Sequence, residues 1–133
     1  MRVLIKRYVV ILMPLLLISC GDEKAWAPPA QSWQDLSIRI ETRPTVIRPG
    51  MNEFLVIANR QQRGFTNDLM VDVRTEQSGG WKQAMPDGAL GVYRKALPVS
   101  DIQHDHLYVR LQRRGEDGEL VFALAPAKLK ASH

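Results

Sequence analysis

Short stretches of the chain after residue 35 alternate between apolar and polar residues. Leu36, Ile38 and Ile40 are separated by polar residues, and this period of two places one side of a β-strand in a core and the other side in water. The stretch 54–58 is apolar throughout, which is typical of a central strand covered on both faces. By these criteria the sequence predicts strands over 36–41, 54–58, 69–74, 91–97, 107–112 and 120–124.

The last two predicted strands form the clearest pair. Both alternate, and the segment 114–118 between them ends in Asp-Gly, which favours a hairpin turn. No stretch after residue 35 repeats apolar residues at the spacing of an amphipathic helix. We therefore predict an all-β fold, an antiparallel β-sandwich of about six to seven strands, with a small closed barrel as the alternative. Met70 and Met85 are expected to fill the core.

The first 20 residues have the layout of an export signal. A basic start precedes the uncharged stretch 8–18, which is too short to span a bilayer as a helix of roughly 20 apolar residues. The sequence Leu-Ile-Ser-Cys at 17–20 resembles the lipobox of bacterial lipoproteins, whose signal peptidase cuts before a cysteine that carries diacylglycerol. We therefore expect residues 1–19 to be removed and Cys20 to be acylated. An ordinary secretory peptide is the alternative, but it does not explain why the only cysteine stands at the cut.

The segment that follows the cysteine shows no period. Residues 20–34 are rich in Ala, Pro and polar residues, and we predict a flexible tether that reaches up to roughly 45 Å. Within it, Trp33 is expected to pack on the edge of the domain and Trp26 to lie at the bilayer interface. The domain itself is expected over 35–125, and 126–133 is predicted to be a flexible tail.

Charge argues against a nucleic-acid partner. The whole chain has a formal charge of +4, but the signal peptide holds three of its 18 Lys and Arg residues. Its removal leaves 15 basic residues against 14 acidic ones, and these are interspersed. Because acylation would use the only cysteine, no disulfide is expected, and the exported domain must depend on its core.

Motifs in the predicted domain resemble a known family. They are Pro49-Gly50-x-Asn52-x-Phe54-x-Val56, then Asp87-Gly88 with Tyr93 five residues later, and then the closing hairpin. Their order over residues 36–124 resembles the FixH-like and YtkA-like group of bacterial exported domains. This resemblance implies an immunoglobulin-like sandwich at a membrane, and a link to respiratory-oxidase assembly or copper supply. FixH has a membrane-spanning helix, whereas this chain is expected to have a lipid anchor.

The sequence lacks the motifs of familiar catalytic sites. It contains no Gly-x-Ser-x-Gly elbow, no His-Glu-x-x-His and no glycine-rich phosphate loop. Acylation would also remove the only thiol nucleophile. We therefore predict that the protein is not an enzyme.

One short segment is a candidate metal site. His104 and His106 lie two residues apart, so their imidazoles would point the same way in an extended chain. They could bind one Cu(II), Ni(II) or Zn(II) ion, with Asp101 as a third ligand. A polar loop with solvated histidines that bind nothing is the alternative.

A second segment is a candidate contact with a partner protein. The loop 60–67 is polar except for Phe65, and aromatic and arginine side chains contribute much of the energy of protein interfaces. Phe65 is therefore expected to contact a partner together with Arg60 and Arg63. In the alternative, Phe65 folds under its own loop.

These features predict a non-enzymatic lipoprotein that binds or assembles another envelope protein and needs no cofactor. Gly21 after Cys20 resembles the sorting sequence of outer-membrane lipoproteins, and we expect the periplasmic face of that membrane. Asp22 keeps the inner membrane open as an alternative. The alternative function is a copper-handling accessory of a respiratory oxidase, in which the His-x-His segment would bind the metal.

Overall fold

The structure is a computed structural model that describes residues 26–60, 68–88 and 91–126. All of its regular elements are β-strands, so the predicted all-β fold is confirmed. The described strands are β1 (Gln31–Trp33), β2 (Leu36–Arg43), β3 (Gly50–Arg60), β4 (Met70–Arg74), β5 (Lys82–Gln83), β6 (Met85–Pro86), β7 (Val92–Val99), β8 (His106–Arg113) and β9 (Glu116–Ala123).

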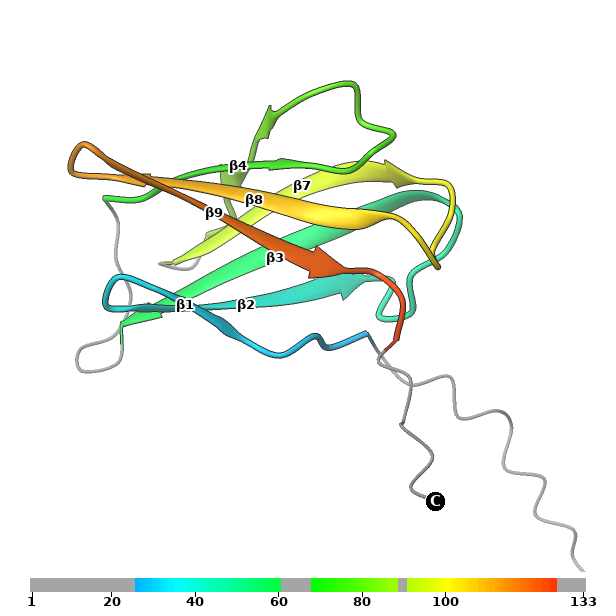
Figure 1. Ribbon diagram of the computed structural model, residues 1–133, viewed down its shortest axis with the longest axis horizontal. Helices are drawn as coiled ribbons and strands as arrows, with labels where there is room; N and C mark the ends of the chain where they lie inside the picture. The colour runs from blue at the N-terminus through cyan, green and yellow to red at the C-terminus, as the bar shows by residue number, and fades with distance from the viewer. Residues whose placement is uncertain (1–25, 61–67, 89–90, 127–133) are drawn as a thin grey trace, which may run out of the picture.

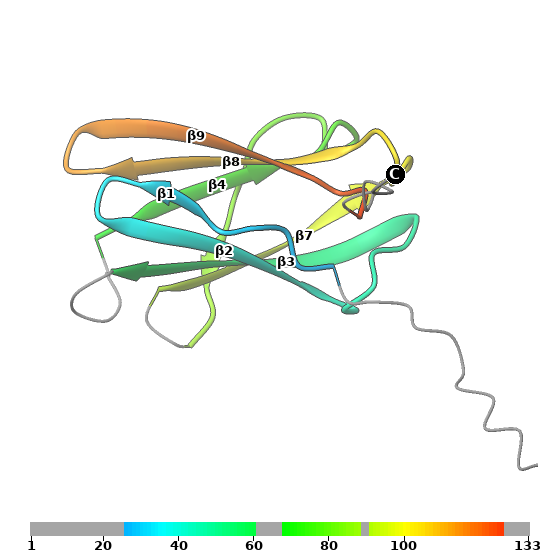
Figure 2. The ribbon, with the colours of Figure 1, turned by 60° about the horizontal axis from the view of Figure 1, so that its bottom comes forward.

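The strands form two antiparallel sheets that pack face to face (Figure 1). One sheet has the order β1-β2-β3-β7-β6, and the other has the order β5-β4-β8-β9. The chain changes sheet between β3 and β4, between β5 and β6, and between β7 and β8. Figure 2 shows the two layers from the side. The predicted sandwich is therefore confirmed in preference to a closed barrel.

The core lies between the sheets and follows the period-two pattern. Leu36, Ile38 and Ile40 of β2 are at most 1% exposed, whereas the residues between them reach the surface. The stretch 54–58 is buried on both faces, as predicted for a central strand. Among the described residues, Phe54 and Phe122 are the largest fully buried side chains, one from each sheet.

The tether prediction is wrong at its C-terminal end. Residues 31–33 form β1, which pairs with β2 at the edge of the five-stranded sheet. Trp26 packs edge-on against Phe54, with 6.1 Å between ring centroids, and its indole N–H donates to the carbonyl of Ala123 at 3.1 Å. The predicted position of Trp33 is confirmed, since it is partly buried against the core. Residues 26–33 thus belong to the domain.

Two further expectations are corrected by strand geometry. Met70 and Met85 are 51% and 57% exposed rather than in the core. Met70 falls on the outward phase of β4, and Met85 lies in the two-residue strand β6. Neither position faces the opposite sheet, so their apolar character alone does not bury them.

The closing hairpin is confirmed, but its turn lies earlier than expected. Arg113 pairs with Glu116, which leaves Arg114 and Gly115 as the two turn residues, both with positive φ. Gly118 instead lies within β9, where a Cβ atom would overlap the indole of Trp33. The Asp-Gly sequence therefore marks a close approach between β9 and the N-terminal segment rather than a turn.

We expect Phe122→Ala to lower the free energy of unfolding by about 3–5 kcal/mol, because Phe122 is 2% exposed in the centre of the core. The neighbouring Val121 is 44% exposed, so Val121→Ala is a matched control that should cost under about 1 kcal/mol. Urea denaturation followed by circular dichroism measures both. Equal losses in the two variants would contradict the observed register of β9.

Candidate functional site

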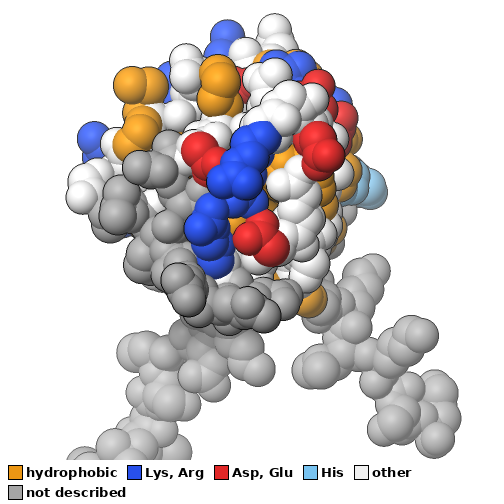
Figure 3. All heavy atoms as spheres, turned by 90° about the vertical axis from the view of Figure 1, so that its left-hand side faces the viewer, with side chains coloured by type: hydrophobic (Ala, Val, Ile, Leu, Met, Phe, Trp, Pro, Cys, Tyr) orange, Lys and Arg blue, Asp and Glu red, His pale blue; other side chains and the backbone are white. Residues whose placement is uncertain are grey.

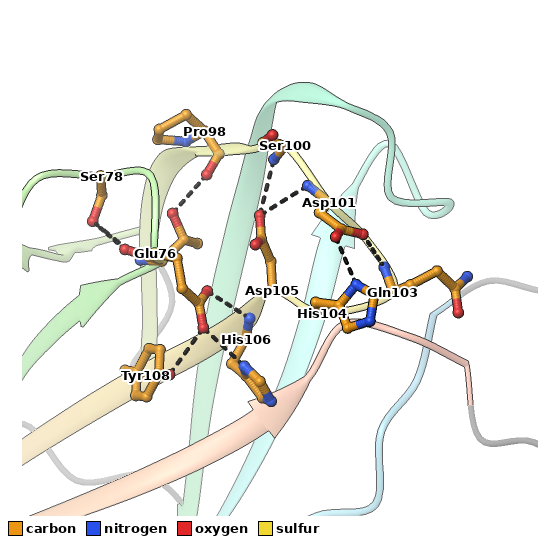
Figure 4. Close-up of polar contacts among 11 residues, drawn as sticks. Glu76, Ser78, Pro98, Ser100, Asp101, Gln103, His104, Asp105, His106 and Tyr108 are labelled. Atoms are coloured by element: carbon orange, nitrogen blue, oxygen red, sulfur yellow. Dashed lines mark hydrogen bonds and ion pairs between the residues drawn. The ribbon is translucent and has the colours of Figure 1, made fainter.

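The histidine segment begins in a turn ahead of β8. The carbonyl of Asp101 accepts backbone N–H groups from His104 (3.1 Å) and Asp105 (2.7 Å), so residues 101–105 are not extended. The Nδ1 of His104 lies 2.6 Å from the Asp101 carboxylate (Figure 4). Hydrogen bonding from this imidazole lowers the pKa of Asp101 from its usual range.

The buried carboxylate of Asp105 stabilises this turn. Its side chain is buried, and its carboxylate accepts the backbone N–H groups of Ser100 (2.9 Å) and Asp101 (3.1 Å). Its own carbonyl accepts the N–H of Leu124 at 3.2 Å. The acid between the two histidines therefore has a structural role in shaping the turn.

His106 belongs to a different cluster, centred on Glu76. The Glu76 carboxylate accepts the backbone N–H of His106 (2.7 Å), contacts the Nδ1 of the same residue (2.8 Å) and accepts the hydroxyl of Tyr108 (2.9 Å). Partial burial raises the pKa of Glu76, but these hydrogen bonds outweigh it and lower the pKa to about 2. Glu76 is therefore an ionised anchor for the start of β8.

The structure does not bring the three predicted metal ligands to one point. Figure 4 shows His104 turned toward Asp101 and His106 turned toward Glu76. Across residues 26–60, 68–88 and 91–126, no three His, Cys, Asp or Glu side chains gather as a metal ion requires. The copper site remains a sequence prediction that this geometry does not support.

Beside this cluster, arginine and aromatic side chains cover the outer face of the sheet β5-β4-β8-β9. The guanidinium of Arg74 lies 3.8 Å from the ring centroid of Tyr108 and 5.1 Å from that of Trp81. Arg110 lies 4.6 Å from the same Trp81 ring, and it also pairs with Asp72 at 2.9 Å. We name this surface the arginine–aromatic face and define it by Arg74, Glu76, Trp81, His106, Tyr108 and Arg110.

The contacts on this face hold its side chains in fixed positions. Arg74 is stacked on two rings, and no carboxylate in the described ranges forms an ion pair with it. Tyr108 is fixed by its hydroxyl on Glu76, and this hydrogen bond raises the pKa of the phenol. A partner would therefore meet a prearranged surface and lose little side-chain freedom on it.

Arg60, the one described member of the predicted partner loop, lies at one end of the sandwich. Its Nε is 3.8 Å from the carboxylate of Asp35, which also binds Arg113 at 2.5 Å. Figure 3 views this end, where basic and acidic side chains lie next to one another. Arg63 and Phe65 lie outside the described residues, as does Cys20. Arg60 therefore has an internal partner, and its proposed contact stays a prediction.

Sequence reasoning missed the arginine–aromatic face, although the same alternation contains it. The apolar residues of β4 and β8 face the core, and the outward set between them holds Arg74, Tyr108 and Arg110. Trp81 had no strand pattern around it because β5 is only two residues long. Reading the outward positions of predicted neighbouring strands together would have indicated most of this surface.

The fold and these surfaces define a β-sandwich domain with a structured outer face. Comparison of the chain with protein-family models, curated proteins and solved structures finds no match. The described residues contain no helix long and apolar enough to cross a membrane.

We expect Glu76→Gln to lower the free energy of unfolding by about 1–2 kcal/mol at pH 7, because it replaces a charged acceptor of three hydrogen bonds with a neutral one. The side chain of Glu76 is a third exposed, and water therefore limits the loss. The pKa of Glu76 is lowered from 4.5 to about 2 in the folded state. Its contribution is therefore fully present above about pH 4.5 and is lost as the pH falls toward 2.

Urea denaturation of both proteins at pH 7 and near pH 2.5 measures this effect. The difference between wild type and Glu76→Gln should shrink at the lower pH. Glu119→Gln is a matched control, since Glu119 is an exposed carboxylate on the same sheet, opposite Arg110. A difference that is independent of pH would show that the Glu76 cluster does not stabilise the fold through its charge.

Proposed function

We propose that this protein is a bacterial lipoprotein, acylated on Cys20, whose β-sandwich domain binds or assembles another envelope protein. The domain has no enzymatic role in this proposal, and it acts at the periplasmic face of the outer membrane. The observation that supports a binding role is the arginine–aromatic face. Arginine, tryptophan and tyrosine are the side chains most enriched among residues that dominate interface energies, and here they are already stacked on one another on the outer face of a sheet.

We also propose that the sandwich is immunoglobulin-like. The orders β2-β3-β7-β6 and β5-β4-β8-β9, with three changes of sheet, correspond to the strand orders ABED and C′CFG of immunoglobulin-like domains. In such domains function resides in exposed strands and loops of a rigid scaffold. The outer face of β4 and β8 corresponds to strands C and F, so it is a natural place for a partner.

The lipid anchor is tested by metabolic labelling with a palmitate analogue. Wild-type protein should take up the label and fractionate with membranes, whereas Cys20→Ala should remain unlabelled and unprocessed or soluble. Mass spectrometry of the mature N-terminus provides the control for cleavage before residue 20. An unlabelled, soluble wild-type protein would reject the lipoprotein proposal.

The binding face is tested by photo-crosslinking in intact cells. A photoreactive residue at Gln112, which is exposed beside Arg110 on β8, should form a discrete protein adduct. The same residue at Arg39, on the outer face of the other sheet, is the matched control and should not. Trp81→Ala should reduce the Gln112 adduct about tenfold, the effect of losing roughly 1.4 kcal/mol at an interface hot spot.

The melting temperature of Trp81→Ala is measured in parallel, so that loss of the adduct is not loss of the fold. Equal adducts from Gln112 and Arg39 would reject this face as the site. An adduct yield that Trp81→Ala does not change would also reject this face as the site.

A further inference from the structure

An apolar groove lies at the end of the sandwich where the described chain begins and ends. Its volume is about 540 Å³, and it opens between the segment 26–31 and the end of β9. Val121, which is 44% exposed, contributes to its wall. The apolar side chains that line it include Trp26, Pro28, Pro29, Ile47, Ile102 and Val121.

The N-terminal wall of the groove is fixed by hydrogen bonds to the body of the domain. The side chain of Gln31 donates to the carbonyl of Val121 at 2.8 Å, and the indole of Trp26 donates to that of Ala123. The backbone N–H of Trp26 also donates to Thr45 at 2.9 Å. These side chains donate hydrogen bonds to carbonyls on the edge of β9, so the walls of the groove are held in place by the fold.

The length of chain before the groove limits its distance from the proposed anchor. Only residues 21–25 separate Cys20 from Trp26. Six Cα-to-Cα steps reach at most about 20 Å when fully extended, less than half the roughly 45 Å that a tether over the whole of 20–34 would allow. The diacylglycerol on Cys20 would lie in the bilayer, whose headgroup layer alone is several ångströms thick. This end of the sandwich therefore has to stay near the membrane surface.

We propose that the groove binds the interfacial layer of the phospholipid bilayer, so that the domain rests on the membrane on its Trp26 end. This inference depends on the proposed acylation of Cys20. Transfer of exposed apolar surface from water into the bilayer is favourable in free energy. Tryptophan side chains also favour the boundary between headgroups and acyl chains. Because the lipid anchor keeps the domain close to the bilayer, the effective concentration of lipid at the groove is high, and even a weak contact forms most of the time.

The test uses the full lipidated protein reconstituted into vesicles of phosphatidylethanolamine and phosphatidylglycerol (3:1) with brominated acyl chains. In a protein with Trp33→Phe and Trp81→Phe, the emission of Trp26 should fall by about half relative to vesicles without bromine. A protein that carries only Trp81→Phe keeps Trp26 in place and is the matched control, since its second tryptophan, Trp33, lies beside the β1–β2 turn at the other end of the sandwich (Figure 1). The emission that Trp33 adds, obtained by difference, should change by less than a tenth.

A second pair of variants tests the groove itself. Val121→Asp places a charge in the groove wall and should at least halve the quenching of Trp26, whereas Gln112→Asp adds the same charge outside the groove and should leave it unchanged. Circular dichroism confirms that each variant is folded. Quenching that Val121→Asp does not affect would overturn the proposal and leave the groove to a partner peptide or the chain's own residues 127–133.

Failure of this inference can be told apart from failure of the proposed lipid anchor. Mass spectrometry that finds no acyl group on Cys20 would reject the anchor, and the membrane contact with it. An acylated protein in which Trp26 is not quenched would reject only the membrane contact. Equal quenching of Trp26 and Trp33 would mean that the domain lies on its side, which also contradicts the proposed orientation.

Discussion

The buried guanidinium of Arg113 fixes how the two sheets meet at one end of the sandwich. Arg113 lies on the core-facing phase of β8, and its side chain is 4% exposed. A charge in this position is costly unless it is paired and hydrogen-bonded. Asp35, from the β1–β2 turn, and Asp68, just before β4, supply carboxylates at 2.5 Å and 3.1 Å. The hydrogen bond from Arg113 also lowers the pKa of Asp35. Pairing of this charge therefore joins the β1–β2 turn of one sheet to the start of β4 and the end of β8 in the other.

That constraint extends to the outer face of the same sheet. Successive side chains of a strand alternate between faces, so a β8 held with Arg113 inward must present Tyr108 and Arg110 outward. The register with β4 then places Arg74 directly opposite Tyr108. The stacking on the arginine–aromatic face is therefore a consequence of the same register that pairs the buried charge. Packing in the interior of the domain thus determines which side chains are exposed on its outer face.

The sequence was sufficient for the long strands and insufficient for the short ones. Eight residues of β2 or β8 show a clear period of two, but β1, β5 and β6 have two or three residues each and show none. The prediction at Gly118 failed for another reason, because a glycine serves equally well in a turn or beneath an indole ring. The metal hypothesis assumed an extended chain from His104 to His106. Only the second of these residues is in a strand, so the shared direction of their side chains is lost.

Strand β1, which the sequence does not predict, shortens the distance over which the domain could move from the membrane. A free tether over 20–34 would let the sandwich search a wide zone above the membrane, whereas β1 and Trp26 bind residues 26–33 to the domain. If Cys20 is acylated as proposed, the Arg113 end would point away from the membrane, and the arginine–aromatic face would lie along the side of the domain. A partner on that face would approach parallel to the bilayer. Such a geometry suits another protein held at the same membrane, because both would then be concentrated in one layer.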